Sequence, residues 1–253
     1  MKGKYILLLC GLFSFSVLCA LNQTDKKGRK QGEWKKTYEN GQVMYEGKFV
    51  NDQPTGVFKR YYESGTLKSV QTYETPERSQ IVVYEEDGKT ISVKGTYLNK
   101  KKEAEWTYYV KGKMSLLEVY NNGQKNGTSK VYTKDGALIE EIPYVHDTID
   151  GMRKRFLQDG KRYSEVSYKK GVEHGSYKLY EGHDFPVVEG VYKNGKRDGD
   201  WILKDDKGVQ TDVMKYKDGV LLNAKELKKE NSDTFDQNEQ NKGKYKEPSE
   251  ENM

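Results

Sequence analysis

Apolar and polar residues alternate along short stretches of this chain. In the stretch from Gly32 to Phe49, GEWKKTYENGQVMYEGKF, four residues of the second half share one side of an extended strand: Val43, Tyr45, Gly47 and Phe49. A spacing of two residues places side chains on one face of a β-sheet, whereas a helix needs a spacing of three or four. The pattern therefore predicts a β-strand in this half of the stretch.

The same stretch recurs at a nearly fixed interval. The aromatic residue that ends each copy lies 23 or 24 residues after the previous one. These residues are Phe49, Tyr73, Tyr97, Tyr120, Tyr144, Tyr168, Tyr192 and Tyr216. A regular period of this length marks a repeat protein, in which each copy packs on its neighbours. We therefore predict a domain of eight repeats over residues 22–222.

Each repeat is predicted to form one β-hairpin. The inner turn carries pairs such as Asn40-Gly41 and Asp87-Gly88, and the linkers between repeats carry pairs such as Asn194-Gly195. These pairs accept the positive φ angles of tight turns. Since a short turn joins every predicted strand to the next, the predicted fold is all-β, an elongated single-layer antiparallel meander of about eight β-hairpin repeats.

The third and fourth repeats depart from this pattern. Both lack the glycine that opens the other repeats. Repeat three has one extra residue in its second strand, and repeat four is one residue short in its first strand. We expect a kink or a widened loop in this part of the chain.

The first 21 residues differ from the repeats. Lys2 and Lys4 precede an uncharged run from Tyr5 to Leu21, which is the layout of a secretory signal peptide. Residues 1–21 are therefore predicted to direct export to the periplasm, the cell surface or the medium. An uncleaved membrane anchor and a lipid anchor at Cys19 are the alternatives.

Composition argues against a thick hydrophobic core. Hydrophobic residues make up 34% of the 253 residues and charged residues 33%, which is a low apolar share for a compact domain. The 20 tyrosines suit a pleated surface with one wet face. Residues 223–253 hold few large apolar side chains and are predicted to form a charged, flexible tail.

The sequence shows no pattern typical of an active site. No two of its three histidines lie at metal-ligand spacing, and both cysteines, Cys10 and Cys19, fall in the predicted signal peptide. We interpret His174 as a solvated turn residue. The adjacent Glu140 and Glu141 should point to opposite faces of a strand and be solvated. We predict no enzymatic activity, no cofactor and no metal.

Aromatic residues recur at equivalent positions of the predicted strands, which predicts ladders of packed rings across the sheet. Aromatic residues expected to be exposed are the candidate contacts for a partner: Trp34, Tyr61, Trp106, Tyr180 and Trp201. Lysine-rich linkers, Lys102 among them, are expected to be solvated along one edge of the sheet.

The segment from Tyr192 to Trp201, YKNGKRDGDW, resembles the MORN-repeat family, specifically its bacterial variant, some of whose members are catalogued as antitoxin-like proteins. The resemblance covers roughly residues 28–219. It implies a scaffold, a dimerisation ribbon or a membrane-adjacent tether without catalysis by the repeats. Cell-wall-binding hairpin repeats, which combine Trp and paired Tyr as in Trp106-Thr107-Tyr108-Tyr109, are an alternative, although the 24-residue period favours MORN.

The hypothesis that follows is a non-enzymatic exported scaffold that binds another protein, or the cell envelope, through an aromatic-rich sheet. The alternatives are a cell-envelope or carbohydrate-binding module and an antitoxin-like inhibitor of a partner protein. Nucleic acid is not an expected partner because an exported protein would not meet it.

Overall fold

The computed structural model describes residues 21–224, and these residues form strands and turns but no helix. The predicted signal peptide lies outside the described residues except for Leu21, and so do Cys10 and Cys19. The predicted tail lies outside them beyond Ala224. What the sequence predicts for the two ends therefore stays a prediction.

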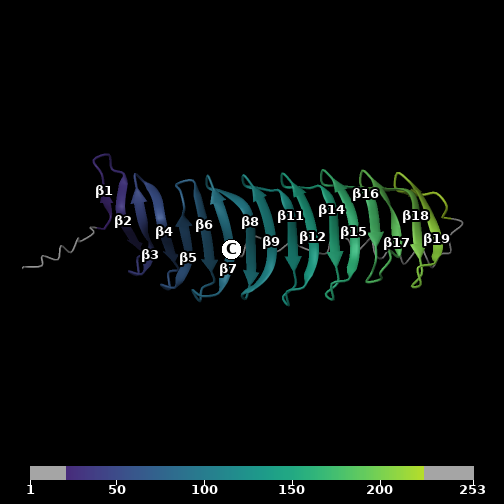
Figure 1. Ribbon diagram of the computed structural model, residues 1–253, viewed down its shortest axis with the longest axis horizontal. Helices are drawn as coiled ribbons and strands as arrows, with labels where there is room; N and C mark the ends of the chain where they lie inside the picture. Colours follow the sequence, from purple (N-terminus) through teal and green to yellow (C-terminus); the bar gives the residue numbers. More distant parts are fainter. Residues whose placement is uncertain (1–20, 225–253) are drawn as a thin grey trace, which may run out of the picture. The chain divides into compact units, whose positions relative to one another are not determined.

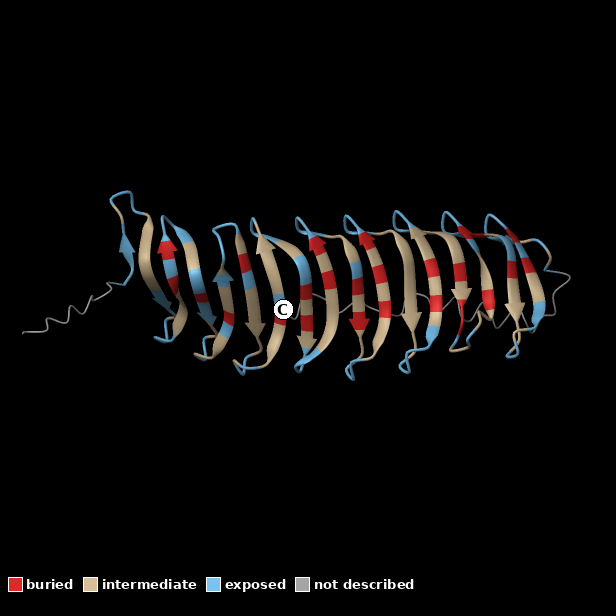
Figure 2. Cartoon of the chain, viewed as in Figure 1, coloured by how far each residue is buried: buried red, intermediate tan, exposed pale blue. Residues whose placement is uncertain are grey.

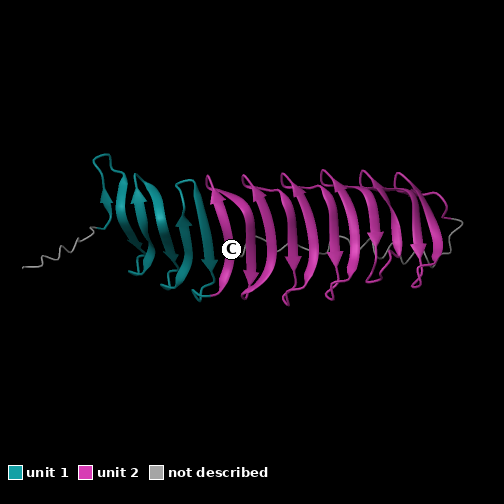
Figure 3. Cartoon of the chain, viewed as in Figure 1, with its two compact units in different colours: residues 1–89 teal, residues 90–253 magenta. Residues whose placement is uncertain are grey.

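The chain divides into two compact units (Figure 3). Unit 1 is Met1–Lys89 and unit 2 is Thr90–Met253. The division falls inside the third repeat, one of the two repeats that lack the opening glycine. Unit 1 thus holds repeats one and two and the first strand of repeat three, and unit 2 holds the remaining repeats.

Unit 1 is an antiparallel meander in which each strand pairs with the next one in sequence (Figure 1). Its strands are β1 (Gln23–Thr24), β2 (Lys30–Thr37), β3 (Val43–Val50), β4 (Gln53–Tyr61), β5 (Leu67–Tyr73) and β6 (Arg78–Tyr84). β2 and β3 form the hairpin of repeat one, and β4 and β5 form the hairpin of repeat two.

Unit 2 continues the same connectivity within itself. Its strands are β7 (Ile91–Leu98), β8 (Lys101–Val110), β9 (Lys113–Asn121), β10 (Gln124–Lys125), β11 (Gly127–Tyr132), β12 (Leu138–Val145), β13 (Thr148–Ile149), β14 (Gly151–Phe156), β15 (Arg162–Lys169), β16 (Val172–Leu179), β17 (Val188–Lys193), β18 (Lys196–Lys204), β19 (Gln210–Lys217) and β20 (Val220–Leu221). The predicted all-β antiparallel meander of hairpin repeats is confirmed in both units.

The register of the hairpins places the opening residue opposite the closing aromatic. Gly32 pairs with Phe49 in this way, and Gly199 pairs with Tyr216. In repeat four, Ala104 pairs with Tyr120 and adopts a φ of 57°, the left-handed region that the opening glycines occupy elsewhere. The repeat geometry therefore imposes this backbone on an alanine, at a cost of about 1–2 kcal/mol.

Tight turns with two left-handed residues lie mainly in the linkers, although repeat four also has one inside its hairpin. Asn122 and Gly123 have φ angles of 52° and 88°. The inner turn of repeat one is instead a three-residue loop, because Tyr38 N–H donates to the Gln42 carbonyl and only Gly41 has a positive φ. In repeat four the inner turn shrinks to two residues, Lys111 and Gly112. The residue predicted to be missing from the first strand is thus missing from this turn.

Alternate residues of each strand fall on two different faces. We call one the aromatic face, because ring contacts join its residues; they are Trp34, Tyr45, Phe49 and Phe58 in unit 1 and Tyr97, Trp106, Tyr120, Tyr177, Tyr192, Trp201 and Tyr216 in unit 2. The other, the charged face, carries cross-strand ion pairs such as Glu46 with Lys59. Buried residues alternate with less buried ones along the strands of unit 2 (Figure 2).

Candidate interaction surface

The largest rings of the aromatic face lie on glycines of the preceding strand. A Cβ on Gly190 would lie 2.3 Å from the Trp201 ring, and a Cβ on Gly95 would lie 2.3 Å from the Trp106 ring. Only a residue without a side chain leaves room for an indole at this distance. The indole N–H of Trp201 also donates to the Val191 carbonyl at 3.2 Å. The indole rings of Trp106 and Trp201 therefore pack directly on the backbone of the preceding strand, because that strand has a glycine at the point of contact.

Three of the five candidate contact residues are buried, so the expectation that they are exposed is wrong. Trp106 is 3% exposed, Trp201 is 0% exposed and Tyr180 is 3% exposed. The two tryptophans are covered by the rings of neighbouring strands. Tyr180 is held by its hydroxyl, which donates to Glu165 Oε2 at 3.1 Å. These side chains maintain the packing and do not present a free surface.

Trp34 and Tyr61 are only partly buried. Trp34 contacts Phe49 with ring centroids 6.0 Å apart, and its indole N–H reaches the Gln23 carbonyl at 3.2 Å. Among the described residues, the only strand on its outer side is β1, which is two residues long. These two residues of unit 1 therefore remain candidate contacts.

Basic residues lie over the aromatic rings, two positions before the opening residue of several repeats. Lys30 Nζ is 4.7 Å from the centroid of Trp34, Lys102 Nζ is 4.9 Å from that of Trp106, and Arg197 Cζ is 5.0 Å from that of Trp201. Such cation–π contacts stabilise partly desolvated sites. Lys102 is therefore not a solvated linker residue as predicted. The recurrence of a basic residue two positions before the opening residue is the sequence signal that could have predicted this contact.

The aromatic face also buries a carboxylate. Glu118 is buried on β9, where its oxygens lie 2.6 Å from Lys125 Nζ and 2.7 Å from the Tyr120 hydroxyl. Burial opposes ionisation, but the hydrogen bonds from Lys125 and Tyr120 outweigh it and hold the pKa of the Glu118 carboxyl below its usual range. Burial and the same carboxylate raise the pKa of Tyr120. The cluster is a charge-compensated core element.

Glu140 and Glu141 point to opposite faces, as predicted, but only one of them is accessible. Glu140 is buried and lies 2.6 Å from Arg153 Nη2, so its predicted solvation is wrong. Glu141 is partly exposed between Lys130 and Lys154, at 3.7 Å and 4.0 Å. The aromatic face therefore holds its charges as buried pairs, and the other face keeps them near water.

Unit 1 contains a shallow hollow of about 530 Å³, lined mainly by residues of the charged face. It is lined by Leu21, Glu33, Trp34, Lys35, Glu46, Gly47, Val57 and Lys59. Val57 is 51% exposed. Near its rim Tyr61 donates to Glu46 Oε1 at 2.6 Å, and burial together with this bond raises the pKa of Tyr61 to about 12. The hollow combines an apolar side chain with charges of both signs.

Three segments of the chain match the family model of the MORN repeat variant: residues 30–51, 54–75 and 125–146. Three of the hairpin repeats therefore match the MORN repeat variant. The first two are the hairpins of unit 1, and the third is the hairpin of β11 and β12. No curated protein matches the chain.

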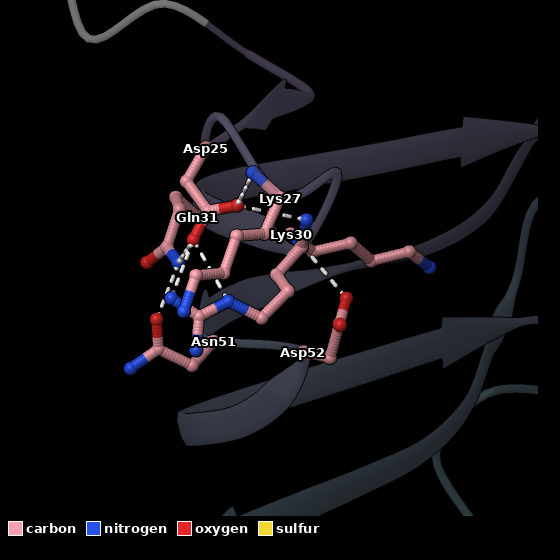
Figure 4. Close-up of polar contacts among 7 residues, drawn as sticks. Asp25, Lys27, Lys30, Gln31, Asn51 and Asp52 are labelled. Atoms are coloured by element: carbon pink, nitrogen blue, oxygen red, sulfur yellow. Dashed lines mark hydrogen bonds and ion pairs between the residues drawn. The ribbon is translucent and has the colours of Figure 1, made fainter.

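Each matched MORN-variant repeat begins near the linker edge, where one repeat is tied to the next. Figure 4 shows this edge in repeat one: Lys30 N–H donates to Asp52 Oδ1 at 2.8 Å, and Asp52 N–H donates back to the Lys30 carbonyl at 3.2 Å. Gln31 Nε2 donates to Asn51 Oδ1 at 2.8 Å. Lys125 and Asp147 repeat the first two bonds in unit 2.

His174 belongs to this linker edge and is not simply a solvated residue. Its Nδ1 accepts a hydrogen bond from the N–H of Asn194 at 3.4 Å, in the next linker. Asp150 does the same for Lys170 at 3.2 Å. The side chain directly before the opening residue therefore binds the backbone of the following turn. The sequence analysis missed this role, although Asp150 and His174 occupy the same position in successive repeats.

Within residues 21–224, no group of three or more His, Cys, Asp or Glu side chains converges on a point where a metal ion would sit. The same part of the chain holds no helix long and apolar enough to span a membrane.

Proposed function

We propose that this protein is a non-enzymatic, exported scaffold that binds a protein partner through the charged face of its MORN-variant repeats. The support for export is the sequence alone, where Lys2 and Lys4 precede the uncharged run from Tyr5 to Leu21. The support for binding lies in the contrast between the two faces. The aromatic face packs against itself, which leaves the charged face as the broad surface for recognition.

The observation that carries this proposal is the burial of Trp106 and Trp201. A carbohydrate-binding module needs an aromatic ring with one open face, on which a sugar ring stacks. Both indoles are instead covered by neighbouring strands and seated on glycines. This disfavours the carbohydrate alternative, and a pleated face with charges of both signs suits a protein surface better.

The hollow in unit 1 is the part of the charged face we assign to the partner. Val57 offers exposed apolar area, and Lys35 and Lys59 add positive charge beside Glu33 and Glu46. Exposed apolar side chains rimmed by charge are typical of protein contacts. The expected partner surface is a protein segment with an apolar side chain flanked by charges of both signs.

The test is a pull-down with the full chain as bait, against membrane and envelope proteins in one arm and purified cell-wall glycan in the other. We expect a specific protein to be retained, and retention to fall about tenfold or more in Val57→Asp, because a carboxylate would sit in the apolar part of the contact. Val209→Asp is the matched control, since Val209 is 60% exposed but lies in a turn of unit 2.

Two outcomes would contradict the proposal. One is equal loss in both variants, which would place the contact elsewhere. The other is retention on glycan that survives Val57→Asp and is lost in Trp34→Ala, which would favour the carbohydrate alternative. Export is tested separately, by fractionating cells and sequencing the N-terminus of the mature chain.

A further inference from the structure

Each end of the repeat array carries an asparagine whose side chain replaces a β-strand. At the N-terminal end, Lys35 N–H donates to Asn22 Oδ1 at 2.8 Å, and Asn22 Nδ2 donates to the Lys35 carbonyl at 3.0 Å. A residue in a neighbouring antiparallel strand would make the same two bonds. The backbone N–H of Asn22 also donates to the Glu33 carbonyl at 2.9 Å. Three backbone groups on the outer edge of β2 are thereby occupied.

The C-terminal end has a related arrangement on β19, in which the amide bonds two residues instead of one. Lys215 N–H donates to Asn223 Oδ1 at 2.9 Å, and Asn223 Nδ2 donates to the Val213 carbonyl at 2.8 Å. The N–H of Leu222 donates to the Lys215 carbonyl at 2.7 Å. Three outer backbone groups are again occupied.

Two further features accompany each asparagine. The strand next to it in sequence is only two residues long: β1 follows Asn22, and β20 precedes Asn223 by one residue. The backbone N–H that donates to the asparagine Oδ1 belongs to a lysine in both cases, Lys35 and Lys215. Both lysines are exposed. Very short edge strands and edge lysines are devices that keep sheet edges from pairing with another chain.

We propose that Asn22 and Asn223 are terminators of the array, whose side chains prevent the β2 and β19 edges from pairing with a second copy of this chain. The outer edges of β2 and β19 would otherwise offer unpaired N–H and C=O groups to another molecule. The side-chain amide satisfies these groups but ends there, because it offers no strand of its own to extend. Recognition of partners is thereby directed to the faces and away from the ends.

The bonds themselves are tested by hydrogen exchange of single backbone amides in the full chain. We expect Asn22→Ala to speed exchange of the Lys35 amide about fivefold or more and to leave the Lys215 amide unchanged. Asn223→Ala should do the reverse. Each variant is thus the control for the other, and a general loss of folding would speed both amides together. Unchanged exchange in both variants would overturn the proposal.

The consequence is tested by light scattering of the double variant Asn22→Ala/Asn223→Ala over a range of concentrations, in about 0.5 M salt to screen the lysines. We expect its mass to rise with concentration, whereas the wild type stays at constant mass. Asn40→Ala is the matched control, because Asn40 also bonds two backbone groups, Gln42 N–H and the Glu63 carbonyl, but in an inner turn.

Two outcomes of the light-scattering experiment would overturn the proposal. A double variant with faster exchange but the same mass as wild type and Asn40→Ala would show that the amides do not block pairing, and would overturn the proposal. So would a wild type that already associates through these edges. The milder change Asn22→Asp, which keeps the oxygen and loses the N–H donors, should associate less than Asn22→Ala.

Discussion

Trp34 and Trp201 occupy the same position in the first and last repeats, at the ends of the similar segments KKGRKQGEW and KNGKRDGDW, yet their surroundings differ. Trp201 is fully buried among Tyr177, Tyr192 and Tyr216, with ring centroids 5.0, 5.0 and 6.1 Å away. Trp34 is partly exposed and has one such ring contact, to Phe49. The difference comes from the strands on the N-terminal side. A full repeat precedes Trp201, whereas within residues 21–224 only β1 precedes Trp34. Burial in this array is therefore supplied by the neighbouring repeat.

The largest expected effect on stability tests this comparison directly, by replacing each tryptophan with alanine. Trp201→Ala should lower the free energy of unfolding of unit 2 by about 3–5 kcal/mol, since it opens a cavity among three rings. Trp34→Ala should cost unit 1 only about 1 kcal/mol, because water already reaches the side chain. Urea denaturation followed by circular dichroism measures both. Equal losses would mean that the preceding repeat contributes little.

A smaller loss of stability is expected from changing Gly190, the glycine on which the Trp201 ring packs. Gly190→Ala places a methyl group 2.3 Å from the Trp201 ring, so the indole must shift, at a cost of about 1–3 kcal/mol. Val191→Ala on the next residue, which is exposed, should change stability by less than about 0.5 kcal/mol. Intrinsic fluorescence should shift to the red in Gly190→Ala alone. A variant as stable as Val191→Ala would contradict the close approach.

The smallest effect concerns the buried charge of unit 2, which has no counterpart among the ion pairs found in unit 1. Because the folded-state pKa of Glu118 lies below its ordinary value of 4.5, its contribution to stability is present above about pH 4.5 and is lost as the pH falls further. Glu118→Gln should remove this part of the acid sensitivity and cost about 1 kcal/mol at neutral pH by leaving Lys125 without its charge partner. Glu105→Gln, at an exposed position of β8, is the control. An unchanged acid profile in Glu118→Gln would contradict the assignment.

Much of the fold was predictable from sequence because it depends on local spacing. The 24-residue period, the alternation in strands such as Val43–Val50 and the turn pairs together predict hairpins joined in order. The details that were missed depend on neighbours. Ala104 takes the opening position against its own preference because strands on both sides determine the backbone there.

The candidate site was predicted less well, for a physical reason. Spacing shows that Trp106 and Trp201 share a face, but not that a glycine one strand earlier lets each ring lie flat and become covered. Pairing Gly95 with Trp106, and Gly190 with Trp201, would have required reading the sequence across repeats. Trp34 stays partly exposed because only β1 precedes it among the described residues, and Tyr61 stays partly exposed because its side chain lies on the charged face beside Glu46.

The linker edge has a consequence for how the chain acquires its structure. Asp52 bonds Lys30 and Asp147 bonds Lys125, so each tie reaches back only 22 residues. Contacts this short in sequence favour rapid folding, since little loop entropy is lost in forming them. A chain emerging from the ribosome can therefore close each hairpin onto the one before it, long before its own C-terminus has been synthesised.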